Sequence, residues 1–299
     1  MSEKSIPKYA VVIPCYNEEK FIEKTLKSLK NQDYKGNFEI IIVDNNCSDK
    51  TVQIAQKYST KIIKETTPGV CFARQKGLVS TKADIIISTD ADTIFKPNWL
   101  SRIDQEFSKD PELIALSGSC KFSNGPWWSK IYPYFLFGYV YLFSKIFKKP
   151  CYITATNTAF KRTYFDGYNT SLTQGGDELD LLEKMKAKGK FKFIFSNPVY
   201  TSPRRLNKGM WYNIFVSFLF YYLIAYKINK RFNKQIIGMA PAYRETEPRK
   251  LQLSPTFGLF VLILITLVIA FGVPRGHFDY SRDAVKLAYS LVKHIKNMI

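Results

Sequence analysis

YAVVIPCYNEEKFIEKTLKSLKNQ, residues 9–32, contains the pattern of a β-strand followed at once by that of a helix. Residues 9–14 are a short apolar run with β-branched side chains that ends at a proline, which is typical of a buried strand. In residues 18–32, four apolar side chains and one threonine recur at the spacing of a single helix face, namely Phe21, Ile22, Thr25, Leu26 and Leu29. The stretch predicts a strand and then a helix.

The strand pattern returns three times in the first half of the chain. It is found in FEIIIVD (38–44), KIIKE (61–65) and ADIIISTD (83–90), and helical patterns lie between these runs at 49–58 and 70–80. Continuous Val and Ile runs that alternate with helices indicate an α/β domain with a mostly parallel sheet. In such sheets ligands bind at the carboxyl ends of the strands.

Polar clusters follow the ends of these strands. Tyr16-Asn17-Glu18 follows the first strand, Asp44-Asn45-Asn46 the second and Asp90-Ala91-Asp92 the fourth. We therefore expect three loops to converge on one edge of the sheet.

Asp90 and Asp92 are separated by one small residue. Two carboxylates at a strand end are suitable ligands for Mg²⁺ or Mn²⁺ beside a phosphate-bearing substrate, whereas a solvated acidic turn is the simpler interpretation of the same residues. The chain contains neither G-x-G-x-x-G after its first strand nor G-x-x-x-x-G-K-[ST], so the fingerprints of dinucleotide enzymes and P-loop NTPases are missing. With two histidines in 299 residues, a His/Cys metal site is nearly excluded.

The positive charge is concentrated in the second half of the chain. Residues 126–299 contain 26 of the 44 Lys and Arg residues but only 9 of the 25 Asp and Glu residues. This basic half is also rich in aromatic side chains, which favours an anionic membrane surface over a nucleic acid, and no nucleic-acid-binding motif is found.

Five cysteines are odd in number, widely spaced and without a C-x-x-C pair. This pattern indicates reduced, mostly buried thiols in the cytosol. Residues 1–10 lack the apolar core of a signal peptide, so we expect the following domain on the cytosolic side.

Four ordered segments resemble the family 2 glycosyltransferases of GT-A fold. They are VVIPCYNEEKFIEKTLKSL (11–29), IIIVDNNCSDKT (40–51), TPGVCFARQKG (67–77) and DIIISTDADT (84–93), and the resemblance extends over about residues 9–206. It implies a metal-dependent, hexosyltransferase-like enzyme that transfers a sugar, with inversion, from a UDP- or GDP-sugar.

The resemblance also implies a set of donor-binding residues. They are Pro14, Tyr16, Glu18, Asp44, Asn45, Gly69, Arg74 and Asp90. Asp44 is expected to contact the base, although many members carry a second Asp where this chain has Asn45; capping of the next helix is the alternative role for Asp44. Asp92, with Asp90, is expected to hold Mn²⁺ or Mg²⁺ on the diphosphate.

A second acidic pair, Asp177 and Glu178, opens the helical pattern of residues 175–190. Acids at a helix start are the ordinary interpretation, since they interact favourably with the helix dipole. The resemblance implies instead that Glu178 is the general base and Asp177 its neighbour. It also places Asn157 on the acceptor side and Arg204 and Arg205 near the donor diphosphate or an anionic acceptor; contact with lipid headgroups is the alternative for the two arginines.

Three aromatic or apolar segments follow, at 127–149, 210–226 and 257–273. The first two are rich in Trp and Tyr and are typical of helices at a membrane surface. The third is uncharged and predicts a transmembrane or re-entrant helix, with a buried core helix as the alternative. Residues 275–299 predict a basic amphipathic tail.

These patterns predict four regions and a membrane-bound enzyme. Residues 1–206 form the GT-A domain, with the donor site mainly in 9–125 and the acceptor side in 126–206. This domain is followed by an interfacial helix and basic loop (207–250), by the helix of 251–274 and by the tail of 275–299. We expect this domain at the cytoplasmic face of the cell membrane, acting on a lipid-linked or glycan acceptor hydroxyl. A polyprenyl-phosphate acceptor and a non-catalytic scaffold that binds nucleotide sugars remain the alternatives.

Overall fold

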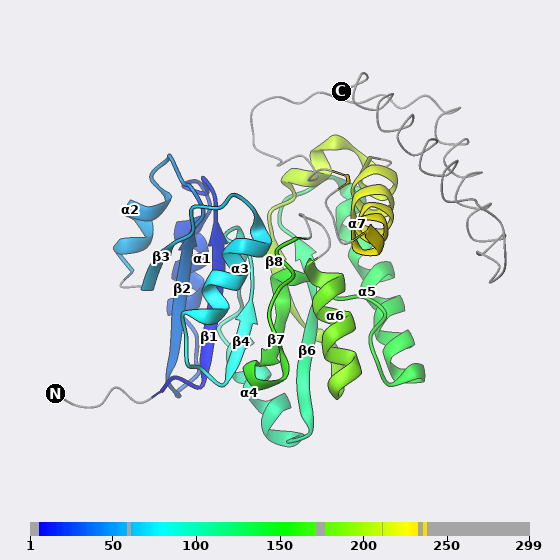
Figure 1. The fold of residues 1–299 in the computed structure, drawn as a ribbon, viewed down its shortest axis with the longest axis horizontal. Helices are drawn as coiled ribbons and strands as arrows, with labels where there is room; N and C mark the ends of the chain where they lie inside the picture. The colour runs from blue at the N-terminus through cyan, green and yellow to red at the C-terminus, as the bar shows by residue number, and fades with distance from the viewer. Residues whose placement is uncertain (1–5, 59–60, 172–176, 211, 233–235, 238–299) are drawn as a thin grey trace. The chain divides into compact units, whose positions relative to one another are not determined.

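A computed structural model describes residues 6–58, 61–171, 177–210, 212–232 and 236–237 (Figure 1). All of these residues belong to one compact unit. They form an eight-stranded sheet in the order β3-β2-β1-β4-β7-β6-β8-β5, with helices on both faces.

The first half of the chain forms four parallel strands joined by helices. The strands are β1 (Tyr9–Cys15), β2 (Phe38–Asp44), β3 (Lys61–Lys64) and β4 (Ile85–Ser88), and the helices are α1 (Ile22–Lys30), α2 (Thr51–Gln56) and α3 (Val70–Val79). β1 lies between β2 and β4, with Tyr9 opposite Phe38 on one side and Ile85 on the other. The strand–helix alternation predicted from residues 9–90 is confirmed.

The second half of the sheet is mixed, so the all-parallel arrangement is limited to β1 to β4, and the whole sheet combines parallel and antiparallel pairs. The elements are β5 (Thr93–Ile94), α4 (Trp99–Lys109), β6 (Leu113–Phe122), β7 (Thr158–Lys161) and β8 (Lys190–Thr201). β7 runs antiparallel to both β4 and β6, and β5 runs antiparallel to β8. β6 and β8 are parallel.

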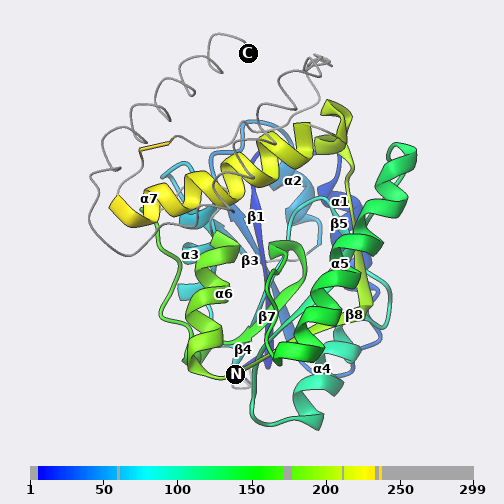
Figure 2. The same cartoon turned by 90° about the vertical axis from the view of Figure 1, so that its right-hand side faces the viewer.

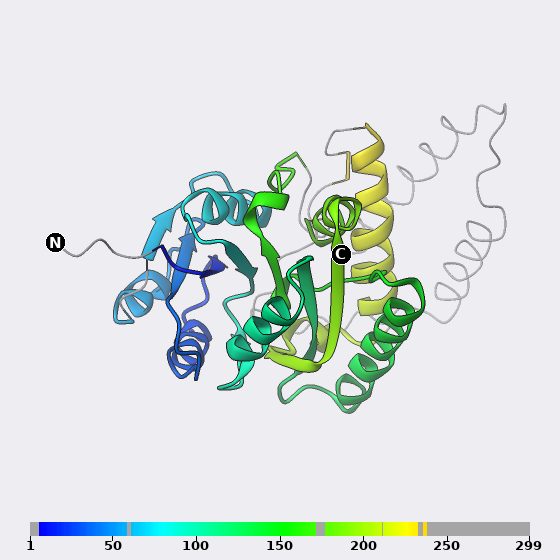
Figure 3. The same ribbon diagram turned by 90° about the horizontal axis from the view of Figure 1, so that it is seen from below.

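Two layers of helices cover the sheet, as the view in Figure 3 shows. Val11 and Ile13 of β1 point into a core shared with α1, α4 and α5 (Trp127–Phe147). Ala10 and Val12 point to the other face, toward α3 and α6 (Asp177–Lys188). Because both faces of β1 are buried, its sequence is an unbroken apolar run.

Further helical segments lie between residues 155 and 232. They are three 3₁₀ segments, η1 (Ala155–Asn157), η2 (Arg162–Tyr164) and η3 (Arg204–Lys208), a π-helix, η4 (Tyr212–Ala225), and α7 (Tyr226–Phe232). Figure 2 shows the last two in yellow as one continuous helical rod. A helix was predicted at 210–226, and most of that segment is helical.

The predicted helix of 251–274 and the tail of 275–299 lie outside the described residues. Within the described ranges, no helix combines the length and the apolar character needed to cross a bilayer. All five cysteines are free, and Cys15, Cys71 and Cys120 are buried, in agreement with the predicted reduced thiols.

Candidate active site

Three loops meet at the carboxyl edge of the parallel strands, as predicted. The loops after β1 and β2 are joined where the Asn45 amide donates to the carbonyl of Cys15 at 2.8 Å. The end of β4 is joined to β1 where the Thr89 amide donates to the carbonyl of Val12 at 3.2 Å. Glu18 and the Asp90–Asp92 pair therefore extend from adjacent strands.

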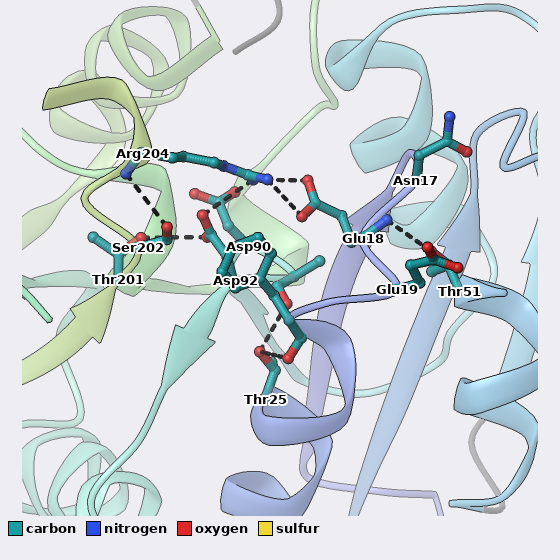
Figure 4. A network of polar contacts seen from close by, with 12 residues as sticks. Asn17, Glu18, Glu19, Thr25, Thr51, Asp90, Asp92, Thr201, Ser202 and Arg204 are labelled. Carbon is teal, nitrogen blue, oxygen red and sulfur yellow. Dashed lines mark hydrogen bonds and ion pairs between the residues drawn. The ribbon is translucent and has the colours of Figure 1, made fainter. Parts of the chain in front are cut away.

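The loop that carries Asp90 and Asp92 is held from two sides, and Figure 4 shows the side on which Thr25 lies. The Thr25 hydroxyl of α1 donates to the carbonyl of Ala91 at 2.7 Å, and both residues are buried. The Thr89 hydroxyl donates to the carbonyl of Thr156 at 2.8 Å. Buried, satisfied hydrogen bonds of this kind fix the backbone between the two carboxylates.

Arg204, at the start of η3, lies between carboxylates of two different loops (Figure 4). Its Nη1 and Nη2 donate to Oε2 and Oε1 of Glu18, each at 2.7 Å, and Nη2 lies 3.1 Å from Oδ2 of Asp92. The guanidinium carbon is also 5.1 Å from the centroid of the Phe21 ring. This two-point pairing orients the guanidinium far more strictly than a single contact does.

Asp92 is the most perturbed carboxyl of this loop. Burial raises its pKa to about 6; the Arg204 guanidinium opposes the increase, and the Asp90 and Glu18 carboxylates add to it. The Thr201 hydroxyl, at the end of β8, donates to Asp92 Oδ1 at 3.3 Å. The site therefore concentrates negative charge that a cation relieves.

Arg74 of α3 connects Asp90 to the second acidic pair. Its side chain is 4% exposed; Nη2 donates to Asp90 Oδ1 at 2.8 Å, and Nη1 pairs with Asp177. One turn further along α3, an added Cβ at Gly77 would lie 2.2 Å from Val12 Cγ1. The glycine thus lets α3 approach β1 closely, and this approach sets the position of Arg74.

Glu178, in the first turn of α6, lies in the same electrostatic environment. Burial raises the pKa of its carboxyl, while the positive charge of Arg74 lowers it and the negative charge of Asp90 raises it. Its Oε2 atom is buried and has no hydrogen-bond partner within the described part of the chain. Asp177, by contrast, is held in its ion pair with Arg74.

The other predicted donor-binding residues are distributed around the first two loops. Pro14 is the sixth residue of β1, and the Tyr16 side chain is exposed. Asp44 Oδ1 accepts a hydrogen bond from the backbone amide of Cys47 at 2.8 Å. Asp44 therefore stabilises the loop after β2 and does not cap the helix that begins at Thr51.

Asn45 supports the loop that leads into α3. Its Nδ2 donates to the carbonyls of Glu65 and Thr67 at 3.0 and 2.7 Å, and its Oδ1 accepts from the amide of Gly69 at 2.9 Å. Gly69 has a φ of 138°, which strongly favours glycine, and the helix of Arg74 begins at the next residue. Both amide donors of Asn45 are therefore used by protein backbone.

Asn157, which the resemblance places on the acceptor side, lies in the interior of the protein. Asn157 is 1% exposed; its Oδ1 accepts from Trp99 Nε1 at 3.0 Å, and its Nδ2 donates to the carbonyls of Ser119 and Asn197. These contacts join β6, β8 and α4 inside the protein. Arg205, in contrast to its neighbour Arg204, is exposed.

Two residues of the site were missed by reasoning from sequence. Thr25 lies on the apolar face of its helix. A buried hydroxyl on such a face needs a hydrogen-bond partner, and this need is a signal that could have predicted the contact with Ala91. Thr201 carried no local signal, because its partner Asp92 is 109 residues away.

The family model described as Glycosyl transferase family 2 matches residues 10–168, which include the three loops and Arg74. The chain belongs to this family. Its match includes Asp90 and Asp92 but ends before Asp177, Glu178 and Arg204.

Curated relatives match over part of their length. Glycosyltransferase AglE of Haloferax volcanii is 32% identical over 105 residues, which are 33% of this chain and 34% of the relative. Poly(ribitol-phosphate) beta-N-acetylglucosaminyltransferase TarS of Staphylococcus aureus is 31% identical over 122 residues, 37% of this chain and 21% of TarS. The chain thus spans about a third or less of these relatives.

Solved structures share the fold of this family 2 protein. Mannosyltransferase PcManGT from Pyrobaculum calidifontis, in complex with GDP-Man and Mn²⁺, has a TM-score of 0.59 at 19% identity, over 96% of this chain and 81% of that one. S. aureus TarS 1–349 in complex with UDP-GlcNAc has a TM-score of 0.52 at 19% identity, over 65% and 58%. The predicted GT-A-like α/β fold is confirmed.

Proposed function

We propose that the protein is an inverting glycosyltransferase that moves a sugar from a UDP- or GDP-sugar to an acceptor hydroxyl. The observation that carries this proposal is the two-sided arrangement around Asp90. Asp92 and Arg204 lie on one side, and Arg74 lies on the other, with Glu178 nearby, whose Oε2 atom has no hydrogen-bond partner among the described residues. The TarS and PcManGT structures hold UDP-GlcNAc and GDP-Man, which makes both nucleotides candidates.

The carboxylate oxygens of Asp90 and Asp92 are suitable ligands for Mn²⁺ or Mg²⁺. Within the described ranges, no three His, Cys, Asp or Glu side chains form a ready group for a metal ion. Mg²⁺ is commonly bound by one or two carboxylates together with substrate phosphates, so Asp92 and Asp90 fit a site that the donor diphosphate completes. When bound, such a cation neutralises charge on the leaving diphosphate.

Arg74 and Arg204 contribute fixed positive charge at the same edge. Each is buried or nearly so and is already oriented by carboxylates, so neither needs to reorganise much to face a diphosphate. In the free protein, Arg204 balances the charges of Glu18 and Asp92.

Glu178 is the better candidate for the general base. Asp177 is paired with Arg74, whereas Glu178 Oε2 has no hydrogen-bond partner in the described part of the chain, and burial raises the pKa of Glu178. In the proposed reaction this carboxylate takes the proton of the acceptor hydroxyl. The hydroxyl oxygen bonds to the anomeric carbon, and the bond from that carbon to the diphosphate breaks, releasing the nucleoside diphosphate.

The acceptor is proposed to be lipid-linked and the enzyme to work at the cytoplasmic face of the cell membrane. The basic, aromatic composition of residues 126–299 supports this proposal. A glycan acceptor without a lipid uses the same chemistry. A polyprenyl phosphate would need little help from Glu178, because its phosphate is already ionised.

Nucleoside diphosphate release tests this function. The full chain, purified in detergent, is incubated with UDP-Glc, UDP-GlcNAc or GDP-Man and with Mn²⁺ or Mg²⁺, and Asp92→Asn serves as the matched control. We expect metal-stimulated release with one donor that is lost in the control. Donor binding by calorimetry without release or transfer would instead support a non-catalytic scaffold.

A further inference from the structure

Helix α5 is apolar on two opposite faces. One face, with Ser129, Pro133, Phe137 and Val140, is buried against the sheet, and the Phe137 ring stacks on Phe193 of β8 with centroids 6.0 Å apart. The opposite face, here called the outer face, is exposed and consists of Trp127, Ile131, Phe135, Tyr139, Leu142 and Ile146. A surface helix of a globular protein ordinarily presents polar side chains there.

The exposure of this outer face is large. Trp127 is 75% exposed, Phe135 76% and Ile146 63%. The spacing of the six residues, at three or four positions, places them on one continuous stripe along the helix. By comparison, α4 buries Trp99, Leu100, Ile103 and Phe107 and exposes Gln105, Ser108 and Lys109. An apolar outer face is therefore not a general property of this protein.

The charged side chains on α5 and directly after it are all lysines. Lys130, Lys145, Lys148 and Lys149 are exposed on α5 or directly after it. The segment 113–165 contains no Asp or Glu. Lys145 lies over the Tyr141 ring, with its Nζ 5.3 Å from the centroid. Apolar and aromatic side chains flanked by lysines complement an anionic lipid surface, because the rings enter the headgroup layer and the ammonium groups contact phosphates.

The start of α5 lies close to the site. The Ser123 amide donates to the carbonyl of Thr201 at 3.1 Å, and an added Cβ at Gly125 would lie 2.9 Å from Pro203. Thr201 contacts Asp92, and Arg204 follows Pro203 directly. Figure 1 shows α5 beside β6, in the half of the sheet away from β3. A bilayer bound along α5 would thus lie near the Arg204 side of the site.

We propose that the outer face of α5 binds the surface of an anionic lipid bilayer, with the helix lying in the headgroup layer. The inference rests on the proposed membrane association and names the surface responsible for it. Binding along the surface agrees with the composition of α5, since its lysines and tyrosines suit an interface.

Hydroxyl-radical footprinting of the full chain tests this inference at the level of side chains. The probe is a vesicle of phosphatidylcholine and phosphatidylglycerol in equal parts, compared with pure phosphatidylcholine. We expect the anionic vesicles to reduce oxidation of Phe135 and Tyr139 several-fold. Oxidation of Tyr164, which is 40% exposed outside α5, is expected to stay constant.

Matched variants separate the outer face from other apolar surface. Phe135→Asp with Leu142→Asp removes two exposed side chains of the outer face, and Ile6→Asp with Val79→Asp makes the same change at two residues that are 64% and 66% exposed elsewhere. Only the first pair should abolish the protection of Tyr139. Lys130→Gln and Lys145→Gln should each weaken binding to anionic vesicles by about fivefold.

Four outcomes would overturn the inference. Flotation of the chain with vesicles in a density gradient measures membrane binding directly. If the chain floats with the vesicles while Phe135 stays accessible to oxidation, another segment binds the membrane and the proposed membrane association survives. If the chain does not float at all, that association fails as well, although donor-dependent transfer in detergent still tests the chemistry. Protection without vesicles that depends on protein concentration would assign the face to a second copy. Protection without vesicles at all concentrations would assign it to another part of the chain.

Discussion

Arg204 and Glu18 are 186 residues apart in the sequence, and two hydrogen bonds of 2.7 Å join the guanidinium of one to both carboxylate oxygens of the other. Arg204 also reaches Asp92, so one cation links the loop after β1 to the loop after β4. The pairing is largely shielded, with side-chain exposures of 19% for Arg204 and 10% for Glu18. Charges in such surroundings are costly to leave without a partner.

Replacing Arg204 is expected to reduce both stability and donor use. Arg204→Ala leaves two buried carboxylates without their cation, which should lower the free energy of unfolding by roughly 3 kcal/mol. Arg204→Lys restores the charge but not the paired geometry, so we expect it to recover stability in part and kcat/KM poorly. Urea unfolding and steady-state kinetics measure the two effects.

Arg205→Ala is the matched control for the stability effect. Arg205 is exposed, so its removal should change the free energy of unfolding by less than about 0.5 kcal/mol. Equal losses in both variants would mean that the Arg204 pairing contributes nothing specific.

Asp92→Asn is expected to lower turnover on the order of 10²-fold or more while leaving the protein folded. The pKa of Asp92 is raised to about 6 from 3.8, chiefly by burial, so the folded state favours the neutral form. Above pH 6 the Asp92 carboxylate is charged in the folded wild type, although water solvates this charge better in the unfolded chain, so the charge lowers the free energy of unfolding. This cost disappears as the pH falls below 3.8, the pKa of Asp92 in the unfolded chain. The variant should therefore unfold at a higher temperature than wild type at pH 8 and at nearly the same temperature near pH 3. A lower melting temperature of the variant at pH 8 would mean that the charged Asp92 carboxylate stabilises the fold.

Glu178→Gln and Asp177→Asn are expected to fail in different ways. Glu178→Gln should reduce turnover by about 10²-fold or more if the acceptor is a hydroxyl, with no loss of melting temperature, because burial already disfavours its charge. Asp177→Asn removes a partner of the buried Arg74 and should mainly destabilise the fold. An undiminished rate in Glu178→Gln would indicate an ionised phosphate acceptor or Asp177 as the base.

The acid limb of the pH profile gives a second measure of Glu178. A general base acts in its deprotonated form, and the pKa of Glu178 is raised by burial. We expect kcat/KM to fall, as the pH is lowered, at a pH above the usual range of a glutamate. Glu178→Gln should lack this limb.

Gly77→Ala is expected to destabilise the protein by about 1–3 kcal/mol, because the added methyl would overlap Val12 and push α3 away from β1. Arg74 lies on the same helix, so donor affinity should fall in the folded fraction. Gly138→Ala is the matched control, since no atom of the described residues lies within 4 Å of an added Cβ there, and it should stabilise α5 slightly. Thermal melting and donor titration distinguish the two variants.

The first half of the fold was predictable because its signals are local. Each buried strand and each amphipathic helix up to Ser88 has its own periodicity, and parallel strands place their carboxyl ends together. The direction of β7 was not predictable, since Thr158–Lys161 is four residues long and carries no mark of its partners.

The strand β6 was missed for a different reason. Its centre contains Ser117, Gly118 and Ser119, which are small or polar but buried. They are tolerated because Ser119 donates to the carbonyl of Phe195 and Ser117 to that of Asn157, 76 and 40 residues away. Burial and distant partners likewise decide the position of Asn157, whose side chain contacts Trp99, Ser119 and Asn197.

The ion pair between Arg204 and Glu18, which joins two segments far apart in the sequence, has a consequence for chimaeric proteins. The family match ends at position 168, so an exchange of C-terminal halves between relatives at that point would keep both acidic loops and replace the segment that carries Arg204. Function in such hybrids should then depend on whether the imported segment supplies a guanidinium at the end of β8. Breakpoints placed after Lys208 should be tolerated better than breakpoints placed near 168.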